Sequence, residues 1–221
     1  MQRFFDIVLC LIALIFLSPI LIITILILRF SAEGEVLYIQ PRVGLEGKLF
    51  GVFKFATMAK NSEKIGTGLI TTKGDPRVFP FGRFLRKTKL NEFPQLFNIL
   101  IGDMSFVGPR PQVQKHFDVF PSHVKKELVK MKPGLTGVGS IFFRDEESIL
   151  EKNRNLSYDE CYSQLIAPYK GELELWYLKN NSVFLYIILI TLTAWVVVFP
   201  ASKLPMKLLK GLPEPPVELA F

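Results

Sequence analysis

IVLCLIALIFLSPILIITILIL, residues 7–28, is the stretch that decides the fold, because its 22 residues include no charge. At about 1.5 Å per residue, a straight helix of this length crosses the roughly 30 Å hydrocarbon core of a bilayer. The run is long for the apolar part of a signal peptide, and Phe30-Ser31-Ala32 is a poor cleavage site. We therefore expect this segment to stay in the protein as its membrane anchor.

Ser18-Pro19, at the middle of this run, leaves the topology of the anchor open. Proline lacks a backbone N–H and kinks a helix, whereas a serine before it can satisfy the carbonyl that is freed. One interpretation is a kinked helix that spans the bilayer. The other is a helix that enters, turns at Ser18-Pro19 and returns to the same face. Arg3 and Arg29 then both lie on the cytoplasmic side, which agrees with the positive-inside tendency.

The overall composition restricts the kinds of binding partner and the cellular location that are possible for this protein. Of 221 residues 49% are apolar, and 27 Lys and Arg against 20 Asp and Glu give a net charge of +7. This excess suits anionic lipid, phosphorylated substrates or nucleic acid. We exclude nucleic acid, because no recognised nucleic-acid module occurs and the anchor accounts for much of the apolar content. Two cysteines, Cys10 and Cys161, provide neither a disulfide framework nor metal-ligand spacing, which favours a reducing, cytoplasm-facing location.

The chain after the anchor predicts a small, mostly helical α+β domain with short strands and surface amphipathic helices. Alternation predicts strands at 36–40, ended by Pro41, and at 48–55. Turn-rich composition predicts loops at 59–76 and 103–112. Helices are expected at 82–89, 93–102, 116–131 and 156–181, the last of them interrupted near Pro168.

A second apolar run, residues 183–199, has 17 uncharged residues between Lys179 and Lys203. This length is the lower limit for spanning a bilayer, and the flanking lysines with Trp195 also suit a helix in the headgroup region. A buried core helix is the third interpretation. The chain then ends in a basic, proline-rich tail, residues 201–221.

Most cations lie in stretches that also contain glycine. Arginine binds phosphate oxygens bidentately, lysine adds a point charge, and glycine lets the backbone come close to a phosphate. Grouped around one acid, Glu92, these cations indicate a site for a polyanion with help from a metal. The cations are Arg42, Lys48, Lys54, Arg83, Arg86, Lys87, Lys89 and Arg110.

The acid itself lies in KTKLNEFPQ, residues 87–95. Asn91 is a candidate N-cap for the following helix, and Glu92 in its first turn is favoured by the helix dipole, which explains both residues without catalysis. The functional interpretation uses the same geometry, since a helix N-terminus attracts anions and a carboxylate beside arginines holds Mg²⁺ against phosphate. The remaining acids and histidines are interpreted as turn formers (Asp75, Asp103) or given no role (His116, His123).

Several longer motifs occur in a fixed order along the chain. They are RFFD (3–6), Ser18-Pro19, QPRVGLEGKLFGVFKFATM (40–58), DPRVFPFGRFLRKTKLNEFPQLFNILIGDMSFVGPRP (75–111), KPGLTG (132–137) and ELELWYLKNNSVFL (172–185). On these motifs the chain, from Arg3 to about Val197, resembles the bacterial sugar transferase family of monotopic phosphoglycosyl transferases. It resembles the small form of that family.

The resemblance implies an activity and a topology. Enzymes of this family move a phosphosugar from a UDP-sugar to polyprenyl (undecaprenyl) phosphate with Mg²⁺, release UMP and start glycan assembly at the cytoplasmic face of the bacterial inner membrane. It implies a re-entrant anchor helix broken at Ser18-Pro19, and residues 183–199 at the membrane surface. The expected organisation is an anchor (1–30), a transferase domain (31–182), a membrane-associated helix (183–200) and the tail (201–221).

The resemblance also implies roles for single residues. An Asp-Glu dyad carries the reaction in the family: the Asp attacks the β-phosphate and the Glu binds Mg²⁺. The matching positions here are Asn91 and Glu92. Substrate phosphate binding is expected of Lys54, Arg86, Arg110 and Arg42, together with Glu174, which stands where the family usually has an Asp.

Asn91 departs from the family pattern, because a neutral amide is a poor nucleophile toward phosphorus. Three hypotheses follow. Glu92 attacks in its place, or polyprenyl phosphate attacks directly in a ternary complex whose cations and metal stabilise the transition state. In the third, the protein is a non-catalytic scaffold that holds nucleotide-sugar or polyprenyl phosphate for partner glycosyltransferases.

Overall fold

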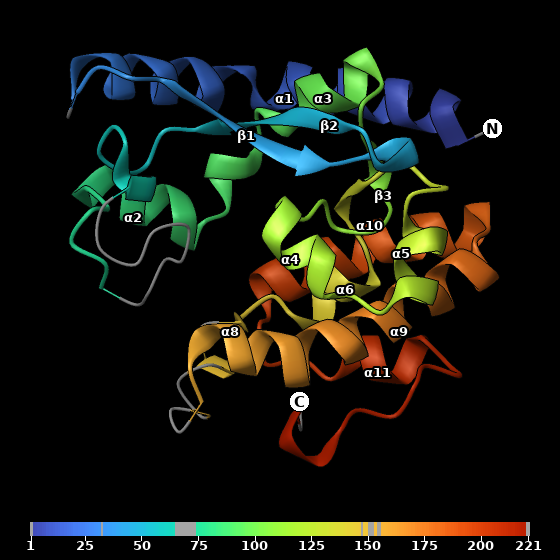
Figure 1. Ribbon diagram of the computed structural model, residues 1–221. Helices are drawn as coiled ribbons and strands as arrows, with labels where there is room; N and C mark the ends of the chain where they lie inside the picture. The colour runs from blue at the N-terminus through green and yellow to red at the C-terminus, as the bar shows by residue number, and fades with distance from the viewer. Residues whose placement is uncertain are drawn as a thin grey trace. The chain divides into compact units, whose positions relative to one another are not determined.

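The computed structural model describes residues 2–31, 33–64, 74–146, 148, 149, 153 and 156–219. The fold is a mostly helical α+β arrangement, as predicted (Figure 1), and the described part contains two small two-stranded sheets. The chain forms two compact units. We call Arg3–Gln40 with Gly51–Gly102 the anchor unit, and Met1–Gln2, Pro41–Phe50 and Asp103–Phe221 the carboxy-terminal unit.

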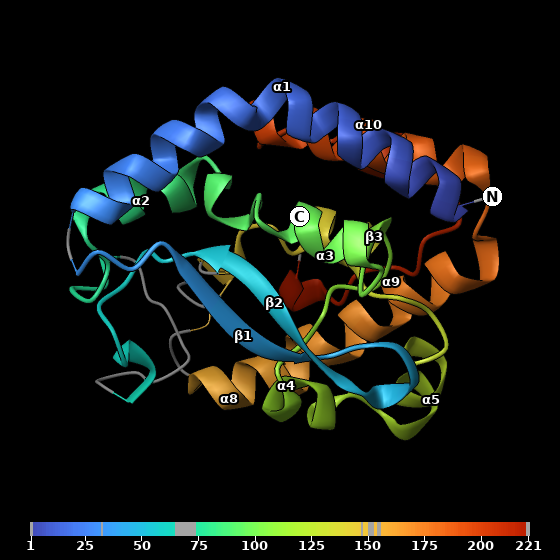
Figure 2. The ribbon, with the colours of Figure 1, turned by 90° about the horizontal axis from the view of Figure 1, so that it is seen from above.

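Helix α1 (Gln2–Phe30) continues through Pro19. The Ser18 hydroxyl donates a hydrogen bond of 2.8 Å to the carbonyl oxygen of Ile15. In a regular helix the N–H of residue 19 would bond to that carbonyl, so the serine replaces the donor that proline lacks. The helix bends near its middle without being interrupted (Figure 2). Within the described residues it is the helix long and apolar enough to cross a membrane.

One face of α1 is covered along its whole length. The covered residues follow a spacing of three and four, which is one helical stripe: Asp6, Cys10, Leu14, Leu17, Leu21, Thr24 and Leu28. At the start of the helix, the Arg3 guanidinium donates to the carbonyl oxygens of Ile99 and Leu100. The opposite face exposes large apolar side chains, among them Phe16 at 77%. Residues near both ends of α1 thus contact the rest of the anchor unit.

Strands β1 (Leu37–Val43) and β2 (Leu49–Phe55) pair in one sheet. The predicted end of the first strand at Pro41 is wrong. Each strand of a two-stranded sheet is an edge strand, and an edge strand tolerates a proline because one side of it needs no N–H donor. The second strand is confirmed. A short 3-10 helix, η1 (Leu45–Gly47), connects the two.

The rest of the anchor unit packs helices on β2. These elements are η2 (Ser62–Lys64), α2 (Pro80–Lys87), η3 (Leu90–Glu92) and α3 (Gln95–Ile101). Buried Asn98 connects α3 to the strand, since its amide donates to the Gly51 carbonyl at 2.8 Å and accepts from the Phe53 N–H at 2.9 Å. The predicted helices are confirmed. Of the predicted loop 59–76, residues 65–73 lie outside the described part.

The carboxy-terminal unit contains a parallel pair, β3 (Ser105–Val107) with β4 (Gly134–Thr136), in which Ser105 faces Gly134. The prediction of a loop over all of 103–112 therefore missed a strand. The predicted helix 116–131 is two helices, α4 (Gln114–Val119) and α5 (Ser122–Leu128). Pro121 separates them, because it cannot donate and disfavours a helical residue before it.

The last helices begin with α6 (Val138–Phe142) and α8 (Tyr158–Cys161). A π-helical turn, η4 (Tyr162–Ile166), then precedes α9 (Ala167–Asn180). The predicted interruption near Pro168 is this π turn, which ends two residues before the proline.

Helix α10 (Val183–Val198) packs against β3, β4 and α6 with one buried face. Its other face exposes Phe184, Trp195 and Val198. The tail is also folded, since it contains α11 (Leu204–Leu208) and η5 (Val217–Leu219) and buries Leu209.

Candidate functional site

The predicted site residues are divided between the two units. The anchor unit contains Lys54, Arg86, Asn91 and Glu92. The carboxy-terminal unit contains Arg42, Arg110 and Glu174. The two groups are described in turn.

Apolar packing on α1 holds the segments that carry the first group. One cluster joins α1 to β2, α2 and η3, and its members are Leu21, Leu28, Phe55 and Leu85, with Leu90 and Phe93 packed against them. In the sequence, Lys54 precedes Phe55 and Arg86 follows Leu85. Asn91 and Glu92 lie between Leu90 and Phe93. The polar candidates are therefore next in the sequence to residues that pack on α1.

Asn91 does not cap α3, so that prediction is wrong. It lies in η3, and the N-cap of α3 is Pro94, whose side chain has no polar atom. The Asn91 Oδ1 atom is buried, and it has no hydrogen-bond partner among the residues that the structure describes. A buried acceptor left unpaired costs about 1–3 kcal/mol. A buried oxygen without a partner suits a bound cation or donor better than a purely structural role.

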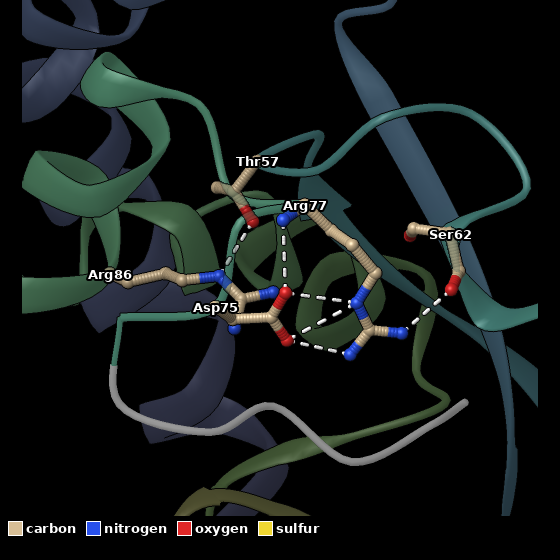
Figure 3. Close-up of polar contacts among 5 residues, drawn as sticks. All are labelled: Thr57, Ser62, Asp75, Arg77 and Arg86. Carbon is tan, nitrogen blue, oxygen red and sulfur yellow. Dashed lines mark hydrogen bonds and ion pairs between the residues drawn. The ribbon is translucent and has the colours of Figure 1, made fainter. Parts of the chain in front are cut away.

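Lys54 and Arg86 are each held by a neutral, buried side chain. Lys54 Nζ donates to Gln40 Oε1 at 3.0 Å, and Gln40 is only 9% exposed. Arg86 Nε donates to Thr57 Oγ1 at 2.8 Å (Figure 3). Such bonds fix a charged group in one orientation, as recognition of a phosphate requires.

Asp75 forms the turn that was predicted for it and also a buried ion pair that the sequence analysis missed. Its Oδ1 accepts from the Arg77 backbone N–H at 3.0 Å. Its carboxylate also binds the Arg77 guanidinium, with Nη2 to Oδ2 at 2.6 Å (Figure 3). The Asp-Pro-Arg spacing was a signal for this pair, because a carboxylate and an arginine two residues apart around a turn can meet.

In the second group, Glu174 is buried in α9 beside glycines. Its Oε1 accepts from the Arg110 backbone N–H at 3.3 Å, and a Cβ on Gly139 would overlap that oxygen. Within the described residues its Oε2 is buried without a partner. Burial raises the pKa of the Glu174 carboxyl to about 7, although the Arg110 N–H opposes the shift. This carboxyl can therefore hold or give up a proton near neutral pH.

Two further charged residues accompany Glu174 and were not predicted. Lys170, one helical turn earlier on α9, is 2% exposed and pairs with Glu146. Burial opposes ionisation of Glu146, but the charge and hydrogen bond of Lys170 and the charge of Arg110 lower the pKa of that carboxyl. The four-residue spacing of Lys170 and Glu174 could have indicated a shared face of the predicted helix.

Arg42 contacts the loop after β3 that carries Arg110, because Arg42 Nη1 donates to the Pro111 carbonyl at 3.1 Å. The structure thus brings Arg42, Arg110 and Glu174 together with Glu146 and Lys170. His116 lies nearby, stacked on Tyr162 with ring centroids 4.2 Å apart. Burial lowers the pKa of His116 to about 4, so its imidazole is neutral at neutral pH.

The buried Glu174 predicts that folding stability falls as the pH rises from about 4.5 to about 7. In this window the folded protein keeps a proton, with a pKa of about 7, that the unfolded chain, with a pKa of 4.5, has lost. The full loss is on the order of 3 kcal/mol and is constant above the window. Glu174→Gln removes this contribution. Denaturant unfolding at pH 5 and pH 8 measures it, and an equal pH dependence in the parent and the variant would contradict it.

Together these features define a class: an α+β protein with a long apolar N-terminal helix and with cationic and acidic side chains that packing and hydrogen bonds hold in place. Comparison with known families makes the assignment specific. The chain belongs to the bacterial sugar transferase family, whose match covers residues 1–200.

Curated relatives agree with this assignment. The chain is 38% identical over 167 residues to the UDP-glucose:undecaprenyl-phosphate glucose-1-phosphate transferase of Klebsiella pneumoniae, covering 73% of this chain and 35% of the relative. It is 34% identical over 212 residues to the undecaprenyl-phosphate galactose phosphotransferase of Salmonella typhimurium, covering 89% and 40%.

A shorter relative is covered more fully. The exopolysaccharide production protein ExoY of Sinorhizobium fredii is 34% identical over 177 residues, which are 74% of this chain and 76% of that protein. The chain thus spans less than half of the length of the two transferases and most of this third relative.

Proposed function

We propose that this protein transfers a sugar-1-phosphate from a UDP-sugar to undecaprenyl phosphate, releases UMP and so starts glycan assembly. The observation that carries the proposal is the family match over residues 1–200, together with relatives named for this reaction. The geometry supports it, because the cations expected to bind phosphate are held in fixed orientations. UMP release by the detergent-solubilised protein, with and without undecaprenyl phosphate, tests the proposal.

The chemistry of each candidate residue determines the role that we propose for it. Lys54, Arg86, Arg42 and Arg110 bind the phosphate groups of the substrates and balance their charge. Glu174 is buried beside the Arg110 loop and contributes to the same substrate binding. The sugar nucleotide is thereby oriented for transfer.

Glu92 and Asn91 are consecutive residues of η3, and a carboxylate oxygen and the unpaired Asn91 Oδ1 are oxygen ligands of the kind that would hold Mg²⁺. The described residues contain no group of three or more His, Cys, Asp or Glu that could hold a metal ion. Substrate phosphates would supply further oxygen ligands to a bound Mg²⁺. When bound, Mg²⁺ neutralises charge on the diphosphate as the bond to UMP breaks.

With asparagine at position 91, we propose direct transfer. A phosphate oxygen of the lipid carrier attacks the β-phosphorus of the UDP-sugar, and a new P–O bond forms. The bond from that phosphorus to the oxygen of the α-phosphate breaks, and its electrons leave with UMP. Attack by Glu92 is the alternative route, but it would take this carboxylate from the metal. Direct transfer predicts sequential kinetics.

A non-catalytic binding function is the second candidate, and Asn91 is the observation that favours it. In this hypothesis the same cations hold nucleotide-sugar or polyprenyl phosphate for partner glycosyltransferases. Binding of UDP-sugar without release of UMP would distinguish it from the transferase.

We also propose that α1 is a re-entrant anchor at the cytoplasmic face of the bacterial inner membrane. The continuous covered stripe supports this, because a helix that crossed to the far side would leave the anchor unit at one end. Residues 31–182 then form the transferase domain and 183–200 a membrane-associated helix, whose exposed apolar face suits the bilayer surface. The tail, 201–221, follows them.

Cysteine labelling tests the topology. Single cysteines placed at residues 2 and 33, in a variant whose native Cys10 and Cys161 are replaced by alanine, are expected to react with a membrane-impermeant reagent from the same side. The reason is that a re-entrant helix returns both ends to one face. Inverted and right-side-out vesicles provide the measurement. Labelling from opposite sides would contradict the re-entrant anchor.

Arg110→Ala is expected to weaken UDP-sugar binding at least tenfold, because a hydrogen-bonded charge pair contributes about 1.5–3 kcal/mol. The matched control is Lys126→Ala, which removes an exposed cation on α5. Isothermal calorimetry with UDP-glucose compares the two. Equal weakening would indicate attraction to the net charge of the protein and contradict a specific role of Arg110.

A further inference from the structure

We propose that the buried Asp75–Arg77 pair is a positioning device for Arg86. It orients the Arg86 guanidinium through Thr57, and neither member of the pair needs to touch substrate. The proposal depends on the proposed function only for what Arg86 then binds. It concerns residues of the anchor unit alone.

The pair is built as a rigid unit. Arg77 Nη2 lies 2.6 Å from Asp75 Oδ2 and Arg77 Nε lies 2.9 Å from Oδ1, an arrangement in which both groups meet edge to edge. The side chains are only 8% and 3% exposed. The third side of the guanidinium donates from Nη1 to the Ser62 carbonyl at 2.7 Å (Figure 3). A bidentate pair that is buried and further hydrogen-bonded has one geometry.

This unit fixes the backbone that carries Thr57. Met58 pairs with Val78 in an antiparallel bridge, and the Ala59 N–H donates to the Arg77 carbonyl at 3.1 Å. The segment after Thr57 is therefore held at both Ser62 and Ala59 to the turn that Asp75 closes. Removal of the Asp75 charge would leave a buried, unbalanced guanidinium and release this connection.

Thr57 in turn holds Arg86. Its side chain is 5% exposed and accepts from Arg86 Nε at 2.8 Å. Helix α2 packs closely against the backbone of Thr57, since a Cβ on Gly82 would overlap the Thr57 carbonyl oxygen. The bond at Nε sets the plane of the guanidinium, and bidentate recognition of a phosphate depends on that plane.

Hydrogen exchange of the Arg86 Nε–H, followed by NMR of ¹⁵N-arginine-labelled protein in detergent, tests the positioning directly. We expect Asp75→Asn and Thr57→Val to accelerate this exchange at least tenfold, and Thr57→Ser to restore it. The control is Glu35→Gln, which removes an exposed ion pair with Lys60 in the same unit. Unchanged exchange in Asp75→Asn, or equal acceleration in Glu35→Gln, would overturn the proposal.

A double-mutant cycle tests the consequence for ligand binding, with UDP as the probe. Asp75→Asn is expected to raise the Kd for UDP at least fivefold in the parent and to have no further effect in the Arg86→Ala background. Additive effects would mean that the pair acts elsewhere, and would overturn the proposal. If the parent binds no UDP, the proposed function fails, while the exchange measurement still decides whether the pair positions Arg86.

Discussion

Glu92→Gln is expected to reduce UMP release at least a hundredfold. The change keeps the shape of the side chain but removes the charge that we propose holds Mg²⁺ beside the substrate phosphates. Single groups that stabilise a transition state typically contribute factors of about 10²–10³. The assay is release of UMP from UDP-sugars by solubilised protein with undecaprenyl phosphate and Mg²⁺.

Glu127→Gln is the matched control for this change, since Glu127 is paired with Lys130 at the surface of α5. It should leave turnover unchanged. Turnover by Glu92→Gln within a factor of a few of the parent would show that the carboxylate has no part in the reaction. A drop that is recovered by raising the Mg²⁺ concentration would identify metal binding as the step that is lost.

Asn91→Asp is expected to increase UMP release by on the order of a hundredfold or more. A carboxylate can attack phosphorus where an amide cannot, and nucleophiles removed from enzymes lower turnover by larger factors still. The variant should also change the kinetics from sequential to ping-pong. Without lipid acceptor, intact-mass measurement should find a phosphosugar attached to the protein.

Asn180→Asp makes the same chemical change at an exposed position near the end of α9 and is expected to have no effect. If Asn91→Asp neither accelerates turnover nor forms an adduct, position 91 is not where a nucleophile would act. The direct transfer proposed for the parent would then lose its main argument, namely the identity of this residue.

The long N-terminal helix could be predicted because its signal is local. A run of 22 residues without charge specifies a helix from composition alone, and the neighbouring Ser18-Pro19 specifies how its hydrogen bonding is repaired. The interruption before Pro168 was predictable for the same reason. In each case the chemistry of two adjacent residues is enough to predict the local backbone structure.

The errors arose where the structure depends on distant segments. Strand β3 has three residues and exists because it pairs with β4, so the turn-rich loop pattern concealed it. The Glu146–Lys170 pair joins residues 24 positions apart, outside any motif. The error at Asn91 has a local cause instead: Asn91 has the residue type of a cap, but α3 begins later, with Pro94 as its N-cap.

The measurement that tests the central claim most directly is UMP release by the parent protein itself. The solubilised chain, with Asn91 unchanged, is given UDP-sugars and Mg²⁺ with or without undecaprenyl phosphate. We predict UMP only when the lipid phosphate is present, and its loss when EDTA removes the metal. No UMP from the parent, beside rapid release by Asn91→Asp, would contradict direct transfer and make the parent a binding protein on a transferase scaffold.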